Sequence, residues 1–233
     1  MKCSIIIPCY NESANLPALV ARLDAFQTKE EMEFILVENG SADYSYRIMQ
    51  ELTKGKKAFK IVKVEVNQGY GYGLQQGLAS ATGNYVGWWH ADMQLGMNEM
   101  GDFVSYLSEH NYPKHVMLKA SRRNRSMMDY VFTFGQAVYN SILFCTCMND
   151  VQATPILFDI ALRDKLIHQP NGFEIDLYVY YMAKREGYVI HRIPVQQLER
   201  VGGASSWNTG LKAKFRQTGR IFKSSIALKK SMQ

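Results

Sequence analysis

The chain has 233 residues, of which 47% are hydrophobic and 21% are charged, a size that allows one sizeable core and is short for two independent ones. The formal charge of +6 belongs to the C-terminus, because residues 200–233 contain eight Lys or Arg and no Asp or Glu. Its four cysteines form neither a C-x-x-C pair nor a spaced metal-binding set, which argues against a structural zinc site and fits a reducing compartment.

Strands and helices alternate along the first ninety residues. The apolar run 4–8 predicts a short buried strand, and apolar residues at helical spacing follow it from Leu16 to Phe26. Further strands are expected at 34–37, 59–66 and 84–89, with helices at 44–54 and 69–81. Such regular alternation predicts an α/β fold, with a mostly parallel central sheet flanked by helices.

The second half of the chain is less regular. Helices are expected at 97–110 and 174–187, and strands at 115–119 and 188–195. Residues 130–149 lack charge over a length that would just cross a membrane. Thr133, Gln136 and Asn140 form a polar stripe at helical spacing there, which favours a buried or interfacial helix.

Polar clusters follow three of the predicted strands, at residues 10–12, 38–41 and 90–94. In an open parallel sheet, ligands bind outside the carboxyl ends of the strands, where all three clusters should lie. Each cluster taken alone could be an ordinary turn whose Asn, Gly and Ser supply only turn geometry. Three clusters at one edge favour a ligand site.

Several segments carry a resemblance to a known family when their order and spacing are considered together. They are IIIPCYNE (5–12), NQGYG (67–71), GLASATGNY (77–85), HADMQ (90–94) and RVGGAS (200–205). The chain resembles the family 2 inverting glycosyltransferases of the GT-A fold, in the dolichyl-phosphate mannose synthase-like branch. The resemblance covers nearly the whole chain, with a GT-A domain expected over 1–199 and a mobile loop and basic tail over 200–233.

The resemblance implies a role for each matching position. The nucleotide sugar would contact Pro8, Tyr10, Asn11, Glu12, Glu38, Asn39, Asn67, Gly71, Ala91 and Asp92. Mn²⁺ or Mg²⁺ would be held by Asp92, Gln94 and His90, and the acceptor by Arg122, Arg125 and Ser205. The implied catalytic residues are Asp92, Asp176, Arg122 and Arg200. Together the cation and the arginines would stabilise charge that develops on the leaving diphosphate.

Two positions depart from the family pattern. His90 stands where the family has a carboxylate; its imidazole suits Mn²⁺ better than Mg²⁺, unless it is a histidine with no role in the site. Asn39 stands where the family has a second acid, so this position now presents a donor as well as an acceptor to the nucleotide. The metal preference and the nucleotide are therefore left open.

The acceptor decides whether a general base is needed. A polyisoprenyl phosphate oxygen is already ionised near neutral pH, whereas a sugar hydroxyl on a lipid-linked glycan must lose its proton to a carboxylate. Asp176 and Glu174 are the candidates for that base, although acidic residues also occur at helix starts because they suit the helix dipole.

The basic tail bears on where the protein works. On a helical wheel, Leu211 and Phe215 share one side with two further apolar residues, and Lys212 and Arg216 share another with two further basic ones. This pattern is typical of a helix on an anionic membrane surface, although a solvated cationic helix also fits it. The N-terminal apolar run is too short for a signal peptide. We therefore expect a cytoplasmic protein, peripheral to a membrane or bound to a membrane-spanning subunit.

Two other classes of function compete with an enzyme. A non-catalytic nucleotide-sugar-binding subunit would explain His90 and Asn39, but Asp92 and Arg200 argue against it. A nucleic-acid-binding protein would use the basic tail, yet it leaves the HADMQ segment and the glycine spacing unexplained. We expect no nucleic-acid partner.

Overall fold

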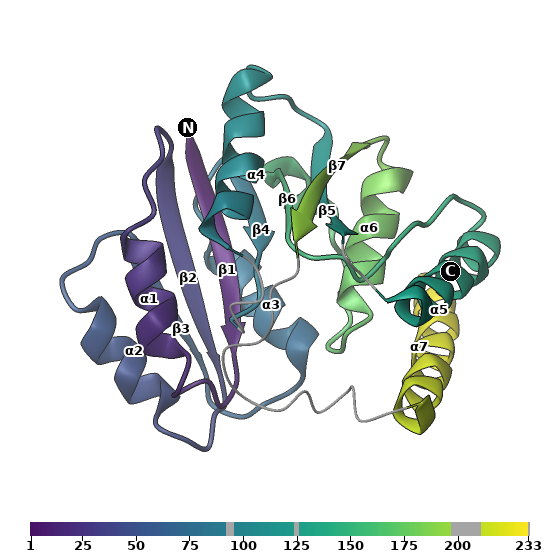
Figure 1. Cartoon of the computed structure of the whole chain (residues 1–233), viewed down its shortest axis with the longest axis horizontal. Helices are drawn as coiled ribbons and strands as arrows, with labels where there is room; N and C mark the ends of the chain where they lie inside the picture. The colour runs from purple at the N-terminus through teal and green to yellow at the C-terminus, as the bar shows by residue number, and fades with distance from the viewer. Residues whose placement is uncertain (92–95, 124–125, 197–210, 233) are drawn as a thin grey trace.

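The computed structural model describes residues 1–91, 96–123, 126–196 and 211–232, with only the backbone for 211–218 and 220. Helices cover both faces of a central sheet (Figure 1). The strands are β1 Lys2–Cys9, β2 Glu31–Asn39, β3 Phe59–Val64, β4 Tyr85–Trp88, β5 Val116–Arg123, β6 Ile156–Asp159 and β7 Val189–Gln196. The helices are α1 Leu16–Asp24, α2 Ser45–Thr53, α3 Tyr70–Ser80, α4 Met97–Glu109, α5 Met127–Phe144, the 3-10 turn η1 Ile160–Lys165, α6 Ile175–Arg185 and α7 Leu211–Ser231.

The described strands form one seven-stranded sheet in the order β3-β2-β1-β4-β6-β5-β7. Only β6 runs antiparallel to its neighbours, β4 and β5. The predicted mostly parallel α/β fold is therefore confirmed. Because β5 and β7 run in the same direction as β1 and β4, their carboxyl ends reach the same edge of the sheet.

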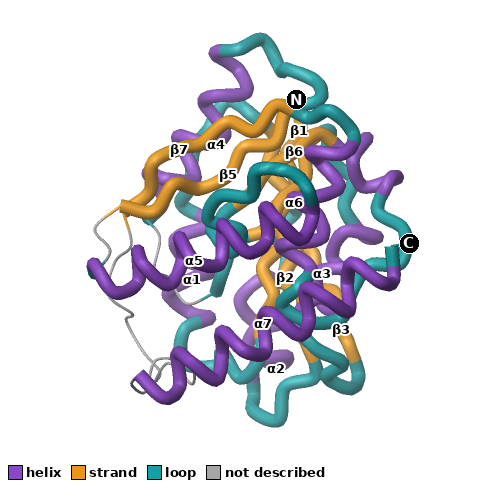
Figure 2. Tube along the Cα trace, turned by 90° about the vertical axis from the view of Figure 1, so that its right-hand side faces the viewer, coloured by secondary structure: helices purple, strands orange, loops and turns teal. Residues whose placement is uncertain are grey.

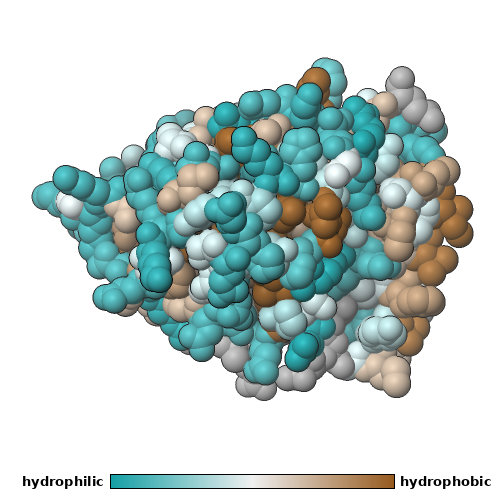
Figure 3. Space-filling model, turned by 90° about the horizontal axis from the view of Figure 1, so that it is seen from above, coloured by the Kyte–Doolittle hydropathy of each residue, from teal (hydrophilic) through white to brown (hydrophobic). Residues whose placement is uncertain are grey.

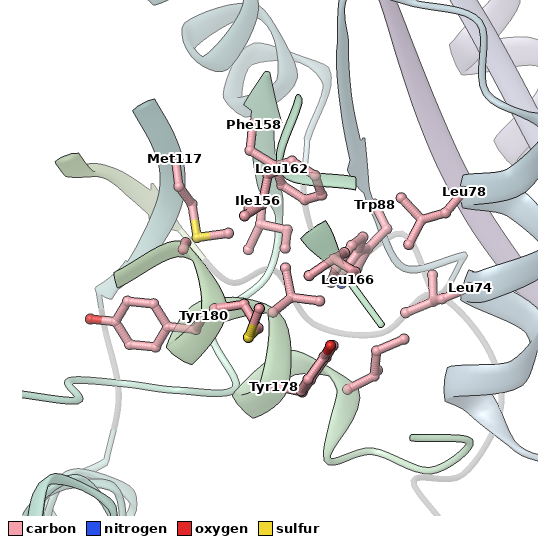
Figure 4. Close-up of a cluster of buried hydrophobic side chains, with 14 of the residues drawn as sticks. Leu74, Leu78, Trp88, Met117, Ile156, Phe158, Leu162, Leu166, Tyr178 and Tyr180 are labelled. Atoms are coloured by element: carbon pink, nitrogen blue, oxygen red, sulfur yellow. The ribbon is translucent and has the colours of Figure 1, made fainter. Parts of the chain in front are cut away.

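Alternate strand residues feed two cores, one on each face of the sheet. Ile5 and Ile7 of β1 point into a core that includes Leu16 of α1 and Phe103 of α4. Ile6 points into the opposite core, whose members include residues of α3, α6 and η1 and of the strands that they cover (Figure 4). Burial on both faces explains why β1 reads as a continuous apolar run.

The antiparallel strand β6 was not predicted, and neither was η1, because the sequence indicated no element between 150 and 173. β6 has only four residues, ILFD, all of them buried. A run this short and buried on both sides shows no alternation to distinguish it from a loop. The pairing of β6 with β4 and β5 therefore became apparent only from the structure.

Two helices pack side by side at one end of the molecule. α7 lies against α5 (Figure 2), where the hydroxyl of Tyr139 donates to the carbonyl of Phe222 at 3.2 Å and their rings lie 4.1 Å apart. Lys229 donates to the carbonyl of Leu143. Among the described residues, no helix combines the length and apolar character needed to cross a bilayer.

Candidate active site

Three polar segments meet at the carboxyl edge of the sheet, as the sequence predicted. β1, β2 and β4 are consecutive parallel neighbours, so residues 10–12, residues 38–41 and His90 follow strand ends that lie side by side. β5 adds Arg122 at its own carboxyl end, and β6 begins at this edge. Two distant halves of the chain thus contribute to one site.

The loop after β1 is fastened to the loop after β2. Asn11 adopts a left-handed backbone conformation, with φ of 56°. Its N–H donates to Oγ of Ser41 at 3.0 Å, and its Oδ1 accepts from the N–H of Ala42 at 2.9 Å. The next N–H, of Glu12, donates to Oγ of Ser45 at 2.9 Å. These bonds fix the loop while Tyr10 and Asn11 stay exposed, as contact with a ligand requires.

Glu38 and Asn39 lie beneath these loops and are only 2% and 4% exposed. Oε1 of Glu38 accepts from the N–H of Ser41 at 2.5 Å, and Nδ2 of Asn39 donates to the carbonyl of Gly69 at 3.1 Å. Oδ1 of Asn39 has no hydrogen-bond partner in the described part of the chain. Glu38 and Asn39, which were predicted to contact the nucleotide, therefore form the floor of the candidate site, and Asn39 has one unused acceptor there. The sequence did not indicate this buried placement.

The start of α3 is pressed against the segment that leads into α6. Gly69 has a φ of 112°, and Oδ1 of Asn67 accepts from its N–H at 2.9 Å. A Cβ on Gly71 would lie 2.3 Å from the carbonyl oxygen of Pro170. Gly71 thus allows a close backbone approach. Gly71 was predicted to contact the nucleotide. In the structure it lets the start of α3 pack against the segment that precedes α6.

Aromatic rings link that junction to the segment after β4. The ring of Tyr70 stacks on His90 at 5.9 Å and on Phe173 at 5.0 Å, measured between centroids. Tyr70 begins α3, and Phe173 precedes α6. His90 is half-buried, and Ala91 beside it is buried. The column holds the His90 ring at the edge of the sheet, where a metal motif was predicted.

Asp176 lies in the first turn of α6, and its carboxylate is buried. Nε1 of Trp88 donates to its Oδ1 at 2.9 Å. Burial raises the pKa of Asp176 above its ordinary value, while its neighbours Lys119, His90 and Arg122 act in the opposite direction. These side chains share one electrostatic environment. Glu174, the other predicted base, is half-buried. It is the N-cap residue of α6, but its side chain makes no capping hydrogen bond to the helix.

Arg122 is paired with an acid that the sequence did not single out. Its guanidinium donates to both carboxylate oxygens of Asp150, through Nε at 3.2 Å and also through Nη2. Both side chains are partly exposed. Sequence reasoning also missed Lys119, which is 1% exposed, and burial lowers its pKa to about 7. A lysine inside the apolar strand segment Val116–Ala120 was the signal that could have found it.

Five predicted site residues lie outside the described residues, namely Asp92, Gln94, Arg125, Arg200 and Ser205. Within the ranges that the structure describes, no group of three His, Cys, Asp or Glu side chains could hold a metal. The described part therefore brings together His90, Asp176, Arg122 and the floor residues, and the metal and acceptor assignments stay predictions.

Known proteins share this architecture. The chain is similar to a glucosyl-3-phosphoglycerate synthase of Mycobacterium tuberculosis solved with Mn²⁺, uridine diphosphate and glucosyl-3-phosphoglycerate, with a TM-score of 0.69 and 15% identity over 97% of this chain and 77% of that one. It is also similar to Staphylococcus aureus TarS 1–349 solved with UDP-GlcNAc, with a TM-score of 0.64 and 21% identity over 98% of this chain and 69% of that one. These likenesses confirm the GT-A fold.

Sequence comparison adds the family. Two relatives bear the name undecaprenyl-phosphate 4-deoxy-4-formamido-L-arabinose transferase. The one from Aeromonas hydrophila is 32% identical over 52% of this chain and 37% of its own length. The one from Pseudomonas fluorescens is 37% identical over 44% of this chain and 31% of its own length, so the chain spans about a third of these relatives. The family model "Glycosyl transferase family 2" matches residues 4–160, a segment that runs from β1 through β6, and the chain therefore belongs to this family.

Proposed function

We propose that this protein transfers a sugar, with inversion, from a nucleotide-diphosphate sugar to a polyisoprenyl phosphate at a membrane surface. The observation that carries the proposal is the convergence of residues 10–12, residues 38–41, His90 and Arg122 at one edge of the sheet in a family 2 chain. The names of the relatives, undecaprenyl-phosphate transferases, support this class of acceptor.

The proposed function includes a divalent cation, held by Asp92 and Gln94 with His90 beside them. Carboxylate and amide oxygens suit a hard cation, and an imidazole suits Mn²⁺ better than Mg²⁺. The half-buried His90 ring, fixed by Tyr70, fits such a role, and one structural relative was solved with Mn²⁺. When bound, the cation would offset negative charge on the diphosphate.

The chain's own residues would then handle the remaining anions. Arg122, with Arg125 and Ser205, is proposed to bind the acceptor phosphate, whose ionised oxygen attacks the anomeric carbon without a general base. Arg200 is proposed to stabilise the leaving diphosphate. A second candidate acceptor is a sugar hydroxyl, favoured by the raised pKa of the Asp176 carboxyl, because a raised pKa makes its carboxylate a stronger base.

An exposed apolar surface on α5 supports the proposal of a lipid acceptor. α5 exposes a row of large apolar side chains, which are Met127, Tyr130, Val131, Phe134, Val138 and Ile142. In Figure 3 apolar side chains gather along the right-hand edge, the side on which α5 lies in Figure 1. The helix α7, which packs beside α5, exposes the two lysines Lys223 and Lys230. Part of the tail's apolar side, at Phe222, contacts α5, so α5 supplies the row proposed to meet lipid.

Substituting Ile142 with serine should weaken binding to anionic vesicles about 5- to 10-fold, because an isoleucine side chain that is 74% exposed in solution would no longer enter the lipid interface. Vesicle sedimentation with phosphatidylglycerol measures this. Ile167→Ser is the matched control, since Ile167 is 65% exposed but belongs to the segment between η1 and α6 and not to the α5 row. Equal losses in the two variants, or no binding by the wild type, would count against the α5 surface.

The nucleotide site is tested by thermal stabilisation with UDP, GDP, CMP or dTDP, each with and without Mn²⁺. One nucleotide at a hundred times its dissociation constant should add about 2.7 kcal/mol of stability, and Mn²⁺ should increase the effect. Transfer is then assayed with the matching nucleotide sugar and a polyprenyl phosphate. Nucleotide binding without transfer to a phosphate or hydroxyl acceptor would favour a non-catalytic regulatory subunit.

A further inference from the structure

Cations from β5 and β7 hold the loop 149–153, which leads from α5 to β6. Lys119 donates through Nζ to the carbonyl oxygens of Val151 at 2.7 Å and Ala153 at 2.6 Å. Arg192 donates to the carbonyls of Asn149 and Ala120. Arg122 pairs with the carboxylate of Asp150 between these points. Hydrogen bonds therefore hold the loop at Asn149, at Asp150 and at the carbonyls of Val151 and Ala153.

This arrangement is costly in free energy. Lys119 is opposite Arg192 in the parallel register of β5 and β7, and like charges at directly opposite positions repel. Lys119 is also withdrawn from water, which explains why its pKa falls to about 7. The ring of Tyr180 offsets part of the cost, with Nζ of Lys119 5.2 Å and Cζ of Arg192 5.5 Å from its centroid. An apolar side chain would fill the same space without this cost.

The loop that is held in this way carries a strained residue. Asp150 has a φ of 37°, a left-handed conformation that is unfavourable for a non-glycine residue and persists only when neighbouring contacts fix it. The N–H of Ala153 donates to the carbonyl of Asp150 at 3.0 Å, and Lys119 binds the carbonyl of that same Ala153. Lys119 thus secures the turn that sets the direction of the Asp150 carboxylate.

We propose that Lys119 is a positioning residue, which acts through the 149–153 loop and Asp150 to aim the guanidinium of Arg122 at an anionic substrate group. The inference rests on the proposed function for the identity of that group, the acceptor phosphate. Lys119 itself is not expected to contact substrate, because its amino group is buried beneath the loop and donates hydrogen bonds to two backbone carbonyls. Its removal should therefore affect the acceptor and leave the nucleotide unaffected.

A double-mutant cycle in the full chain tests the proposal, with farnesyl phosphate as a soluble acceptor probe. Lys119→Met should raise the KM for the probe about 10- to 100-fold, an effect typical of a displaced substrate-binding group, with kcat and nucleotide affinity near wild type. In an Arg122→Met background, Lys119→Met should add nothing further, because both changes remove the same interaction. Effects that multiply in the double variant would overturn the proposal.

Two further measurements separate positioning from general damage. Asp150→Asn, at a partly exposed site, should raise the KM as Lys119→Met does, and it carries the cycle if Lys119→Met does not fold. Lys60→Met is the matched control, because Lys60 also donates to a backbone carbonyl, that of Ser80, but on β3 at the far side of the sheet. It should leave the KM unchanged.

The Nε–H resonance of Arg122 in a nitrogen-15 spectrum reports its pairing with Asp150 without any turnover. It should shift or broaden in Lys119→Met and Asp150→Asn and stay in place in Lys60→Met. An unchanged resonance in Lys119→Met would overturn the positioning role even if the acceptor were misidentified. If the wild type transfers no sugar while the resonance still responds, only the proposed acceptor chemistry fails.

Discussion

Replacing Asp92 with alanine is expected to lower the turnover of sugar transfer about 1000-fold and to abolish the Mn²⁺-dependent part of nucleotide binding. A carboxylate that holds the cation contributes to charge stabilisation in the transition state, where single groups are worth about 100- to 1000-fold. Steady-state transfer assays give the first quantity, and thermal shifts with the nucleotide and Mn²⁺ give the second. The unfolding midpoint without ligand should stay near that of the wild type.

Asp102→Ala is the matched control for this experiment. Asp102 is an exposed acid on α4, ten positions along the chain, and lies outside the converging loops. Its substitution should leave both turnover and the Mn²⁺ effect unchanged. If Asp92→Ala remains active, the metal assignment is wrong, and if both variants lose activity, the loss reflects the fold.

The position of the candidate site could be predicted from the sequence because it depends on the strands running in the same direction. Once 4–8, 34–37 and 84–89 are strands of a parallel sheet, their following segments must share an edge. His90 and the segment 10–12 therefore lie where we expected them. Family resemblance supplied the roles, which no local pattern could provide.

The contacts within the site could not be predicted, because they join residues far apart in the chain. The pairing of Arg122 with Asp150 depends on β6 bringing residues 149–153 back beside β5, and β6 itself gave no sequence signal. The burial of Glu38 and Asn39 follows from the packing of Gly69 and Ser41 over them. Polar side chains at a strand end suggest exposure, and here the fold overrides that expectation.

Replacing Gly87 with alanine should lower the free energy of unfolding by about 3 kcal/mol, the upper end of the usual cost of overpacking. A Cβ at Gly87 would lie 1.9 Å from the carbonyl oxygen of Ile156, which belongs to the neighbouring antiparallel strand β6. Backbone atoms cannot rotate away as a side chain can, so β4 and β6 must separate. Urea denaturation measures the change.

Gly101→Ala is the matched control for this prediction. A Cβ at Gly101 meets nothing within 4 Å, and the residue lies inside α4. Alanine is favoured over glycine in a helix interior by about 1 kcal/mol, so this variant should be slightly more stable than the wild type. Because β4 leads to His90 and β6 follows the 149–153 loop, strain between them should also raise the KM for both substrates in Gly87→Ala. An unchanged stability in Gly87→Ala would mean that the β4–β6 pairing is looser than the structure shows.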